Sequence, residues 1–535
     1  MIEAEVRPNS LPAAAATGFA TALQRLAEAA LWVTLLGLCA GAFVGLDASS
    51  YWVDELWTLF AADPAASTGE VLRRSLMDLH PPAYYLVLHA WMSLVGQSET
   101  AARSLSAIFA VSAIAVFVAS TGAAFSRAAR LFGSVAGAGS VFWFDQAQNL
   151  RSYGLAMLIL SALLACALRA RSGERPGPTL ALSFGALGLL GGFTHYYLFL
   201  ATGLIFLALI FSVRDLRFRL ALIGCGLVIA AAVLAFVRLQ RSSTLFTVTW
   251  FTNDPAFLIA AARDISWSAF GRWSKRILPL LAVCAAAALV LRRRNAGAPS
   301  TPPLGRWTAG LCLFVLAGLT SVGLAVSLLL EPSFTGRNLL LAAPCFWGLA
   351  AWLYDEATAG LPRRAGLALA ALVAAASALN LTGLEGRLLN RKEDWRGSAR
   401  YVSDLPACRG QDILVVPPDL FAPDSAFYRR LAVERFYGRY YRGGSRLVAA
   451  SAAELAHSPA LGSLLKARAR GEDPCPVLAW GAHDMSEANA EALGAALARR
   501  PDVTHPVQVR RFPAYVLSDG RWRSAPSGAY VFEVR

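Results

Sequence analysis

Apolar segments recur along most of this chain, and they restrict its possible folds more than any other feature. A helix of about 20 apolar residues spans the roughly 30 Å hydrocarbon core of a bilayer. Only 16% of the 535 residues are charged, whereas soluble domains carry about 25%. The sequence therefore predicts a polytopic α-helical membrane protein with about 11 to 13 transmembrane helices. The clearest apolar segments are 30–46, 104–125, 132–147, 152–170, 181–196, 197–213, 220–237, 277–291, 308–330, 338–354 and 365–383.

Short basic clusters lie between the apolar segments and orient the chain. If residue 1 is cytoplasmic and each segment crosses once, every cluster falls on the cytoplasmic side, as the positive-inside rule predicts. The net charge of +14 is therefore spread over loops and does not form the contiguous face of a nucleic-acid-binding protein. No nucleic-acid partner is expected. The clusters are 126–130, 169–175, 214–219, 291–295 and 361–364.

The same threading divides the chain into three parts. Residues 1–29 form a cytoplasmic segment, 30–383 a transmembrane domain, and 384–535 an extracytoplasmic domain in which strand-like and helical pieces alternate. We expect a small α/β fold for this last part. Residues 83–96 are apolar but short, and counting them as a crossing would place 126–130 outside. We interpret them as a re-entrant or interfacial segment.

Two of the eight cysteines, Cys408 and Cys475, belong to the extracytoplasmic domain. Disulfides persist in oxidising compartments, so these two cysteines can pair. The chain has neither a CxxC motif nor the Cys/His spacing of a zinc site, and no metal ligand set follows from the sequence.

Two adjacent carboxylates, Asp54 and Glu55, follow the first crossing at the outer face. An isolated pair of this kind is usually a solvated interfacial group within an aromatic belt. However, the same external loop, residues 47–103, continues with the motif DLHPPAYY at 78–85, in which two prolines make the turn rigid. Two acid-bearing turns in one short loop indicate a lined site. The candidate residues of the motif are Asp78, His80, Tyr84 and Tyr85.

Further polar residues reach the same face from later segments. An arginine at the edge of the hydrocarbon is costly without a partner and indicates a functional role. Each residue alone could be structural, with Arg151 paired to Asp145 or His195 ending a helix. Their position on the face opposite the basic clusters favours a substrate pocket. The candidates are Asp145, Arg151, Tyr153, His195, Tyr196 and Arg337.

Carboxylates and arginines at a lipid boundary suit a substrate with an anionic head and a long apolar tail, such as a polyprenyl-phosphate sugar. A carboxylate can take the proton of an acceptor hydroxyl as a general base. Arginines can bind the phosphate through charge-assisted hydrogen bonds and stabilise it as it leaves. The chain shows no Walker or dinucleotide-binding glycine pattern, so a nucleotide is not required.

Several of these segments together resemble a known family. The chain resembles membrane glycosyltransferases of the GT-C fold, in particular glycosyltransferase family 39 with its bacterial lipopolysaccharide-core galacturonosyltransferases, lipid A aminoarabinose transferase and protein O-mannosyltransferases. The resemblance covers roughly residues 30 to 400. It is carried by DELWT at 54–58, by 78–110, by QNLRSYGLAMLIL at 148–160, by GGFTHYYLFL at 191–200 and by KEDWRGSARYV at 392–402.

This resemblance implies roles for several residues. Asp54 matches the catalytic aspartate of the first external loop, with Glu55 beside it. His80 stands where the aminoarabinose transferase has a phosphate-contacting lysine. Because histidine is mostly neutral at pH 7, more of the phosphate binding would then fall to Arg151 and Arg337.

The resemblance also implies the reaction and its location. The expected reaction inverts the anomeric carbon of the sugar and takes place on the periplasmic face of a bacterial inner membrane. The donor would be a polyprenyl-phosphate sugar, and the acceptor would be lipid A, core oligosaccharide, another envelope glycan or a protein. Some GT-C enzymes bind a divalent ion, which Asp78 and His195 could approach.

Other classes of protein remain open at this point. A polyprenol-linked glycan polymerase or ligase would use the same donor. A transporter or flippase for a lipid-linked saccharide would also need many crossings, although transporters bind near the bilayer midplane and often contain inverted repeats. A non-catalytic assembly or sensory protein would give Asp54 no role.

Overall fold

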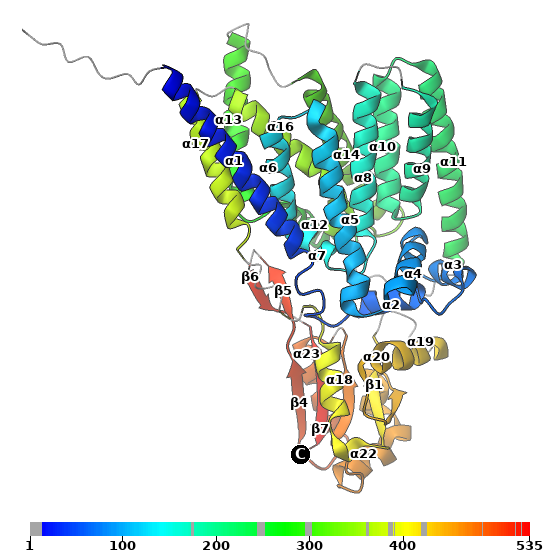
Figure 1. The fold of residues 1–535 in the computed structure, drawn as a ribbon. Coiled ribbons are helices and arrows are strands. Elements are labelled where there is room, and N and C mark those ends of the chain that lie inside the picture. Colours follow the sequence, from blue (N-terminus) through cyan, green and yellow to red (C-terminus); the bar gives the residue numbers. More distant parts are fainter. Residues whose placement is uncertain are drawn as a thin grey trace, which may run out of the picture.

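The computed structural model describes residues 13–172, 176–242, 252–294, 302–359, 363–382, 389, 391–418, 425–483, 485–518, 521–525 and 527–534. A bundle of long helices forms one part of the molecule, and a smaller domain with a β-sheet lies against one end of it (Figure 1). The predicted domain boundary between 383 and 384 and the first part of the predicted cytoplasmic segment, 1–12, lie outside the described residues.

The predicted apolar segments lie on the bundle helices. Within the described residues, five helical segments are long and apolar enough to cross a membrane by length and composition: Thr21–Gly41, Glu99–Ala123, Tyr153–Arg171, Leu216–Arg241 and Pro303–Leu329. The bundle helices are α1 (Ala13–Gly41), α5 (Glu99–Ser120), α6 (Arg127–Ala138), α7 (Val141–Ala147), α8 (Tyr153–Arg171), α9 (Pro178–Gly192), α10 (Tyr196–Ser212), α11 (Leu216–Arg241), α13 (Ser274–Arg294), α14 (Pro303–Leu329), α16 (Ala343–Ala359) and α17 (Arg363–Leu379).

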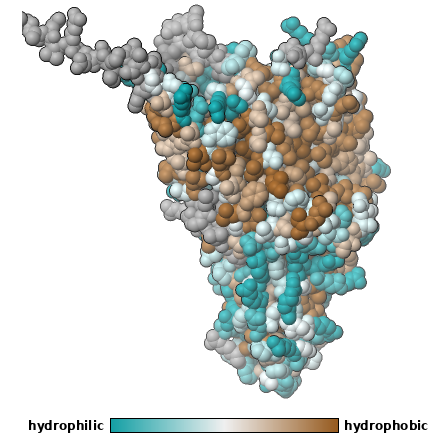
Figure 2. Space-filling model, in the orientation of Figure 1, coloured by the Kyte–Doolittle hydropathy of each residue, from teal (hydrophilic) through white to brown (hydrophobic). Residues whose placement is uncertain are grey.

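The surface of the bundle matches a lipid environment. Figure 2 shows hydrophobic residues over the helical bundle and mainly hydrophilic residues over the C-terminal domain. Large apolar side chains that would be costly in water are exposed here, including Leu182, Phe211 and Leu227. Together with the five long apolar helices, this surface confirms the predicted polytopic helical membrane protein.

One predicted crossing, 132–147, contains two helices instead of one. Helix α6 ends at Ala138, and α7 begins at Val141. The break has a local cause, because Ser140 is extended and its hydroxyl accepts a hydrogen bond from the backbone N–H of Trp143 at 3.0 Å. Such an N-cap starts a new helix. The segment 338–354 is divided in the same way between α15 (Gly336–Leu340) and α16.

Small residues allow two bundle helices to approach closely. A Cβ atom added to Gly137 of α6 would lie 1.9 Å from Nε1 of Trp347 on α16, and one added to Gly133 would lie 2.4 Å from the Trp347 carbonyl oxygen. Trp347 is fully buried. Small residues four positions apart are typical of close helix contacts in membranes. Gly133 and Gly137 therefore allow α6 to pack directly against Trp347 of α16.

The loop between α1 and α5 forms three short helices, α2 (Val53–Ala61), α3 (Thr68–Leu76) and α4 (Ala83–Val95). Figure 1 shows them side by side at the end of the bundle that meets the C-terminal domain. The 13 residues of α4 extend about 20 Å, which is shorter than the roughly 30 Å hydrocarbon core. The sequence did not predict α12 (Pro255–Ser268), a further helix in the later loop 238–276.

The C-terminal domain has the predicted α/β composition. Its five-stranded sheet has the order β2-β1-β3-β7-β4, with β1 parallel to β2 and β3, and with β7 antiparallel to β3 and β4. Strands β5 and β6 form a separate hairpin that lies nearest the bundle (Figure 1). The elements are α18 (Trp395–Ser403), β1 (Asp412–Val416), α19 (Ala426–Leu431), α20 (Gly438–Tyr440), β2 (Arg446–Ala449), α21 (Ala452–His457), α22 (Gly462–Ala469), β3 (Val477–Gly481), α23 (Glu487–Ala498), β4 (Val507–Phe512), β5 (Tyr515–Ser518), β6 (Arg521–Ser524) and β7 (Ala529–Val534).

Cys408 and Cys475 are bonded as a disulfide, with their Cα atoms 4.3 Å apart. The bond joins the turn before β1 to the segment before β3, and both cysteines are buried. The two central parallel strands are therefore linked covalently as well as through the sheet.

Candidate active site

Helix α2 places the two adjacent carboxylates in different environments. Trp52 is the extended N-cap of α2, so Asp54 and Glu55 lie in the first turn, where the helix dipole favours negative charge. Consecutive helical residues project about 100° apart. The side chain of Asp54 is therefore 27% exposed, whereas that of Glu55 is only 1% exposed.

Glu55 is bound on all sides by protein groups. Its carboxylate accepts hydrogen bonds from Arg103 at 2.5 and 2.9 Å and from the backbone N–H of Leu150 at 2.8 Å. It also caps the N-terminus of its own helix through the N–H of Trp52 at 3.3 Å. Arg103 is buried and donates to the carbonyls of three residues before α2, namely Leu46, Ser49 and Ser50. These contacts hold Glu55 firmly in the fold, and the predicted sharing of the catalytic role with Asp54 stays a prediction.

Asp54 faces two arginines that come from distant parts of the chain. Its Oδ2 lies 3.9 Å from Nη2 of Arg151, which precedes α8, and 4.0 Å from Nη1 of Arg337, in the first turn of α15. These distances allow electrostatic attraction but exceed a hydrogen bond. Nη1 of Arg151 donates to Thr58 Oγ1 at 3.3 Å and to the Asp54 carbonyl at 3.4 Å.

A buried chain of hydrogen bonds orients Arg151. Its Nη2 donates to Nε2 of His80 at 3.0 Å, and Nδ1 of His80 lies 3.3 Å from Oδ2 of Asp78. Tyr85 donates its hydroxyl hydrogen bond to the same Asp78 oxygen. In this arrangement His80 contacts the arginine, and its predicted contact to the donor phosphate stays a prediction.

Asp78 is ionised in this network. Burial by itself would raise the pKa of Asp78, but the neighbouring His80, Arg151 and Tyr85 outweigh burial and hold that pKa below its usual value. The negative charge of Asp78, behind His80, therefore compensates the positive charge of Arg151. Nη2 of Arg151, which donates to His80, also lies 3.9 Å from Asp54.

Of the remaining predicted residues, His195 and Tyr153 pack beside this cluster. The ring of His195 lies 6.0 Å from that of His80 and 5.5 Å from that of Tyr153. His195 is also the N-cap of α10, where its Nδ1 accepts from the N–H of Tyr197. Two residues have partners outside the cluster, because Tyr84 bonds Ser106 at 3.0 Å and Tyr196 bonds Gln240.

The predicted approach of Asp78 and His195 to a divalent ion does not fit these contacts. Both residues already bind neighbouring protein groups. Across the described ranges, no group of three or more His, Cys, Asp or Glu residues could hold a metal ion. We therefore derive no step through a metal.

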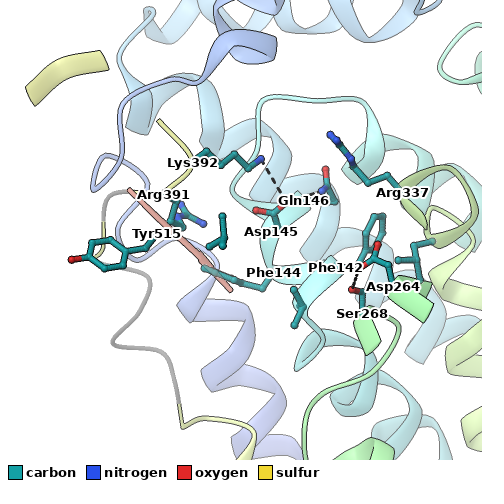
Figure 3. Close-up of a pocket in the computed structure, with 13 residues that line it drawn as sticks. Phe142, Phe144, Asp145, Gln146, Asp264, Ser268, Arg337, Arg391, Lys392 and Tyr515 are labelled. Atoms are coloured by element: carbon teal, nitrogen blue, oxygen red, sulfur yellow. Dashed lines mark hydrogen bonds and ion pairs between the residues drawn. The ribbon is translucent and has the colours of Figure 1, made fainter. Parts of the chain in front are cut away.

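A cavity of about 220 Å³ adjoins this cluster through Arg337, and Asp54 is not one of the described residues that line it. Arg337 belongs to both places, because it contacts Asp54 and also lines the cavity. Nζ of Lys392 lies 3.7 Å from Oδ2 of Asp145. Figure 3 shows these two side chains directed toward each other, with Arg337 on another side of the cavity. The lining comes from α7, α12, α15, residues 391–392 and β5, and includes Phe142, Phe144, Asp145, Gln146, Asp264, Ser268, Arg337, Arg391, Lys392 and Tyr515.

The sequence did not predict Arg391 and Lys392 as site residues. Lys392 has a left-handed backbone with φ of 67°, which is uncommon for a residue with a Cβ. Residues in such conformations are concentrated at functional sites. Its ammonium group lies 3.9 Å from the centre of the Trp52 ring, beside α2. Burial lowers the pKa of Lys392, while Asp145 opposes this shift; burial also lowers the pKa of Arg391 to about 10.

Two solved structures share this architecture. ArnT from Cupriavidus metallidurans in the apo state is 15% identical, with a TM-score of 0.51 over 97% of this chain and 98% of that chain. The structure of ArnT from the same organism bound to undecaprenyl phosphate is 14% identical, with a TM-score of 0.50 over 94% of this chain and 97% of that chain. No family model matches the chain, and no curated protein matches it.

This similarity over the full length shows the fold. The chain has the GT-C fold of a polytopic membrane protein with a C-terminal α/β domain, as the sequence predicted. In particular, its arrangement is that of the ArnT structures.

Proposed function

We propose that this protein is a membrane glycosyltransferase. It transfers a sugar from a polyprenyl-phosphate-sugar donor to a hydroxyl of an envelope acceptor, with Asp54 as general base. One observation carries the proposal: a partly exposed carboxylate, Asp54, lies about 4 Å from two arginines at the polar end of an apolar bundle.

The geometry suits this reaction because the two charges have separate tasks. Arg151 and Arg337 bind the donor phosphate through charge-assisted hydrogen bonds and stabilise it as the leaving group. Asp54 takes the proton of the acceptor hydroxyl, whose oxygen attacks the anomeric carbon on the face opposite the phosphate. The bond between that carbon and the phosphate oxygen breaks, and the product has inverted configuration.

The nature of the donor is supported by the surface and by the comparison. Helix α2, which carries Asp54, lies at the end of the bundle that meets the C-terminal domain (Figure 1), and the surface changes from hydrophobic over the bundle to mainly hydrophilic over that domain (Figure 2). A lipid tail could therefore remain in the membrane while its head group reaches this end of the bundle. The ArnT structure with the same fold binds undecaprenyl phosphate. We infer a bacterial inner-membrane protein with a cytoplasmic N-terminus and a periplasmic C-terminal domain.

The acceptor is lipid A, core oligosaccharide, another envelope glycan or a protein. A polyprenol-linked polymerase or ligase would use the same cluster and would differ in its product. The cavity that Arg337 lines also contains Asp145, Asp264 and aromatic side chains. It offers hydrogen-bonding groups for the donor sugar or for a saccharide acceptor.

The test compares envelope glycolipids and glycoproteins, by mass spectrometry, from cells with and without the protein. A saccharide missing from one class of molecule identifies both donor and acceptor. The purified protein should bind polyprenyl phosphate, and Asp54→Asn should retain that binding but lose transfer by at least about 100-fold. Glu70→Gln, on the exposed side of the same loop, is the matched control and should retain transfer. Transfer that survives Asp54→Asn would exclude Asp54 as the general base. A wild-type protein that transfers no sugar, and whose function in the envelope survives Asp54→Asn, would favour a transporter or an assembly role.

A further inference from the structure

A single carboxylate joins the C-terminal domain to the first turn of α2. Glu393 is 4% exposed and lies in the segment that leads from the bundle to α18. Its Oε2 accepts a hydrogen bond from the backbone N–H of Val53 at 3.1 Å and from Nε1 of Trp395 at 2.6 Å. Its Oε1 is hydrogen-bonded to Nδ1 of His483, which follows β3. Glu393 thus connects α2, α18 and the end of a central strand.

The backbone around Glu393 is fixed by a second set of contacts. Ser50 donates its hydroxyl to the Glu393 carbonyl at 2.8 Å and accepts from the N–H of Trp395 at 3.1 Å. Trp395 is fully buried, and its ring centre lies 4.9 Å from that of Tyr437. The carboxylate therefore extends from a rigid part of the C-terminal domain.

We propose that Glu393 is a positioning residue that sets the place of Asp54. Val53, whose N–H it binds, is the residue immediately before Asp54 and the first residue of α2. A charged acceptor on that N–H fixes the start of the helix and, with it, the direction of the Asp54 carboxylate between Arg151 and Arg337. This inference rests on the proposed function, in which Asp54 is the base.

Other contacts already attach the two domains, so docking does not require Glu393. Glu99 binds Arg396 and the Tyr440 hydroxyl, each at 2.7 Å, and Asp63 binds Arg435 at 3.0 Å. These contacts of Glu99 and Asp63 with the C-terminal domain do not involve the first turn of α2. Loss of the Glu393 carboxylate should therefore loosen α2 while the domains stay together.

The test compares Glu393→Ala with two other variants of the full-length protein. Glu393→Gln keeps an oxygen that can accept from both Val53 and Trp395, because both contacts go to Oε2. Glu533→Ala removes a second buried glutamate of the same domain, which binds Tyr401 and Arg510 and has no contact to α2 among its described partners.

Hydrogen–deuterium exchange of the peptide covering residues 50–60 reports the position of α2 without any assay of function. Exchange should accelerate in Glu393→Ala, remain near wild type in Glu393→Gln, and remain unchanged in Glu533→Ala. Sugar transfer at saturating donor should fall about tenfold to 100-fold in Glu393→Ala, while the affinity for polyprenyl phosphate changes less than about twofold. Glu393→Gln should restore most of the rate.

The outcomes separate this inference from the proposed function. If exchange at 50–60 is unchanged in Glu393→Ala, or equally accelerated in Glu533→Ala, the positioning role is overturned. The same holds if transfer is unaffected in Glu393→Ala. A wild-type protein that neither binds polyprenyl phosphate nor transfers sugar would refute the proposed function, whereas exchange would still decide whether Glu393 holds α2.

Discussion

The adjacent residues Asp54 and Glu55 provide the sharpest test of the site, because substitution by alanine should affect stability at one position and activity at the other. In Glu55→Ala, the buried Arg103 loses the carboxylate that binds it at 2.5 and 2.9 Å. In Asp54→Ala, the lost contacts are those to Arg151 and Arg337, which at 3.9 and 4.0 Å are too long for hydrogen bonds. We therefore expect Glu55→Ala to destabilise the protein and Asp54→Ala to inactivate it.

The magnitude follows from the burial of the pair. Removing one partner of a buried ion pair costs about 3–5 kcal/mol. Arg103 retains three backbone carbonyls, so the lower end of this range, about 3 kcal/mol, applies. That cost corresponds to a decrease of roughly 3 °C in the apparent melting temperature, because the unfolding entropy of a 535-residue chain is about 1.1 kcal/mol/K. Asp54→Ala should change stability by less than about 1 kcal/mol, as is usual for partly exposed positions.

The assay measures thermal unfolding by tryptophan fluorescence in detergent, together with sugar transfer by the folded fraction. Glu55→Leu combined with Arg103→Met should recover part of the stability lost in Glu55→Ala, because no charge is then left unpaired. If Glu55→Ala melts within about 1 °C of wild type but loses transfer, Glu55 acts in catalysis and the structural role is refuted.

Three further predictions follow from the same structure. Arg337→Ala should weaken polyprenyl-phosphate binding about tenfold, as measured by titration, whereas Arg241→Ala, an exposed arginine paired to Glu331, should not; equal affinities in all three proteins would exclude a phosphate contact. Because the pKa of Asp78 is lowered in the fold, its charge stabilises the protein above the unfolded pKa of about 3.9, and this contribution is lost as pH falls through the folded pKa; the wild type should lose more stability below about pH 4 than Asp78→Asn, and parallel acid-unfolding curves would contradict this. Reduction of the disulfide, or Cys408→Ser with Cys475→Ser, should destabilise the C-terminal domain by about 2–4 kcal/mol; an unchanged melting temperature would show that the bond contributes nothing.

The sequence predicted most of the helices, because hydropathy acts over consecutive residues and needs no tertiary context. It missed the division of 132–147 into α6 and α7, since the N-cap by Ser140 is a single polar residue within an apolar stretch. It also missed α12, whose residues form neither a long apolar run nor a clear motif.

For the site, the sequence predicted the face on which the polar residues gather, and the structure brings Asp54, Asp78, His80, Arg151 and Arg337 together there. It could not separate the task of Asp54 from that of Glu55. Both are acids in one turn, and only the contact with Arg103 distinguishes them.

The amino-acid sequence by itself therefore determined the membrane class and the course of the helices, since these depend on the local composition of consecutive residues. Only the tertiary structure decided which acid is exposed, that Lys392 and Arg391 line the neighbouring cavity, and that Glu393 reaches the start of α2. These features arise where segments hundreds of residues apart are packed against each other, and no local pattern encodes which side chains then face one another.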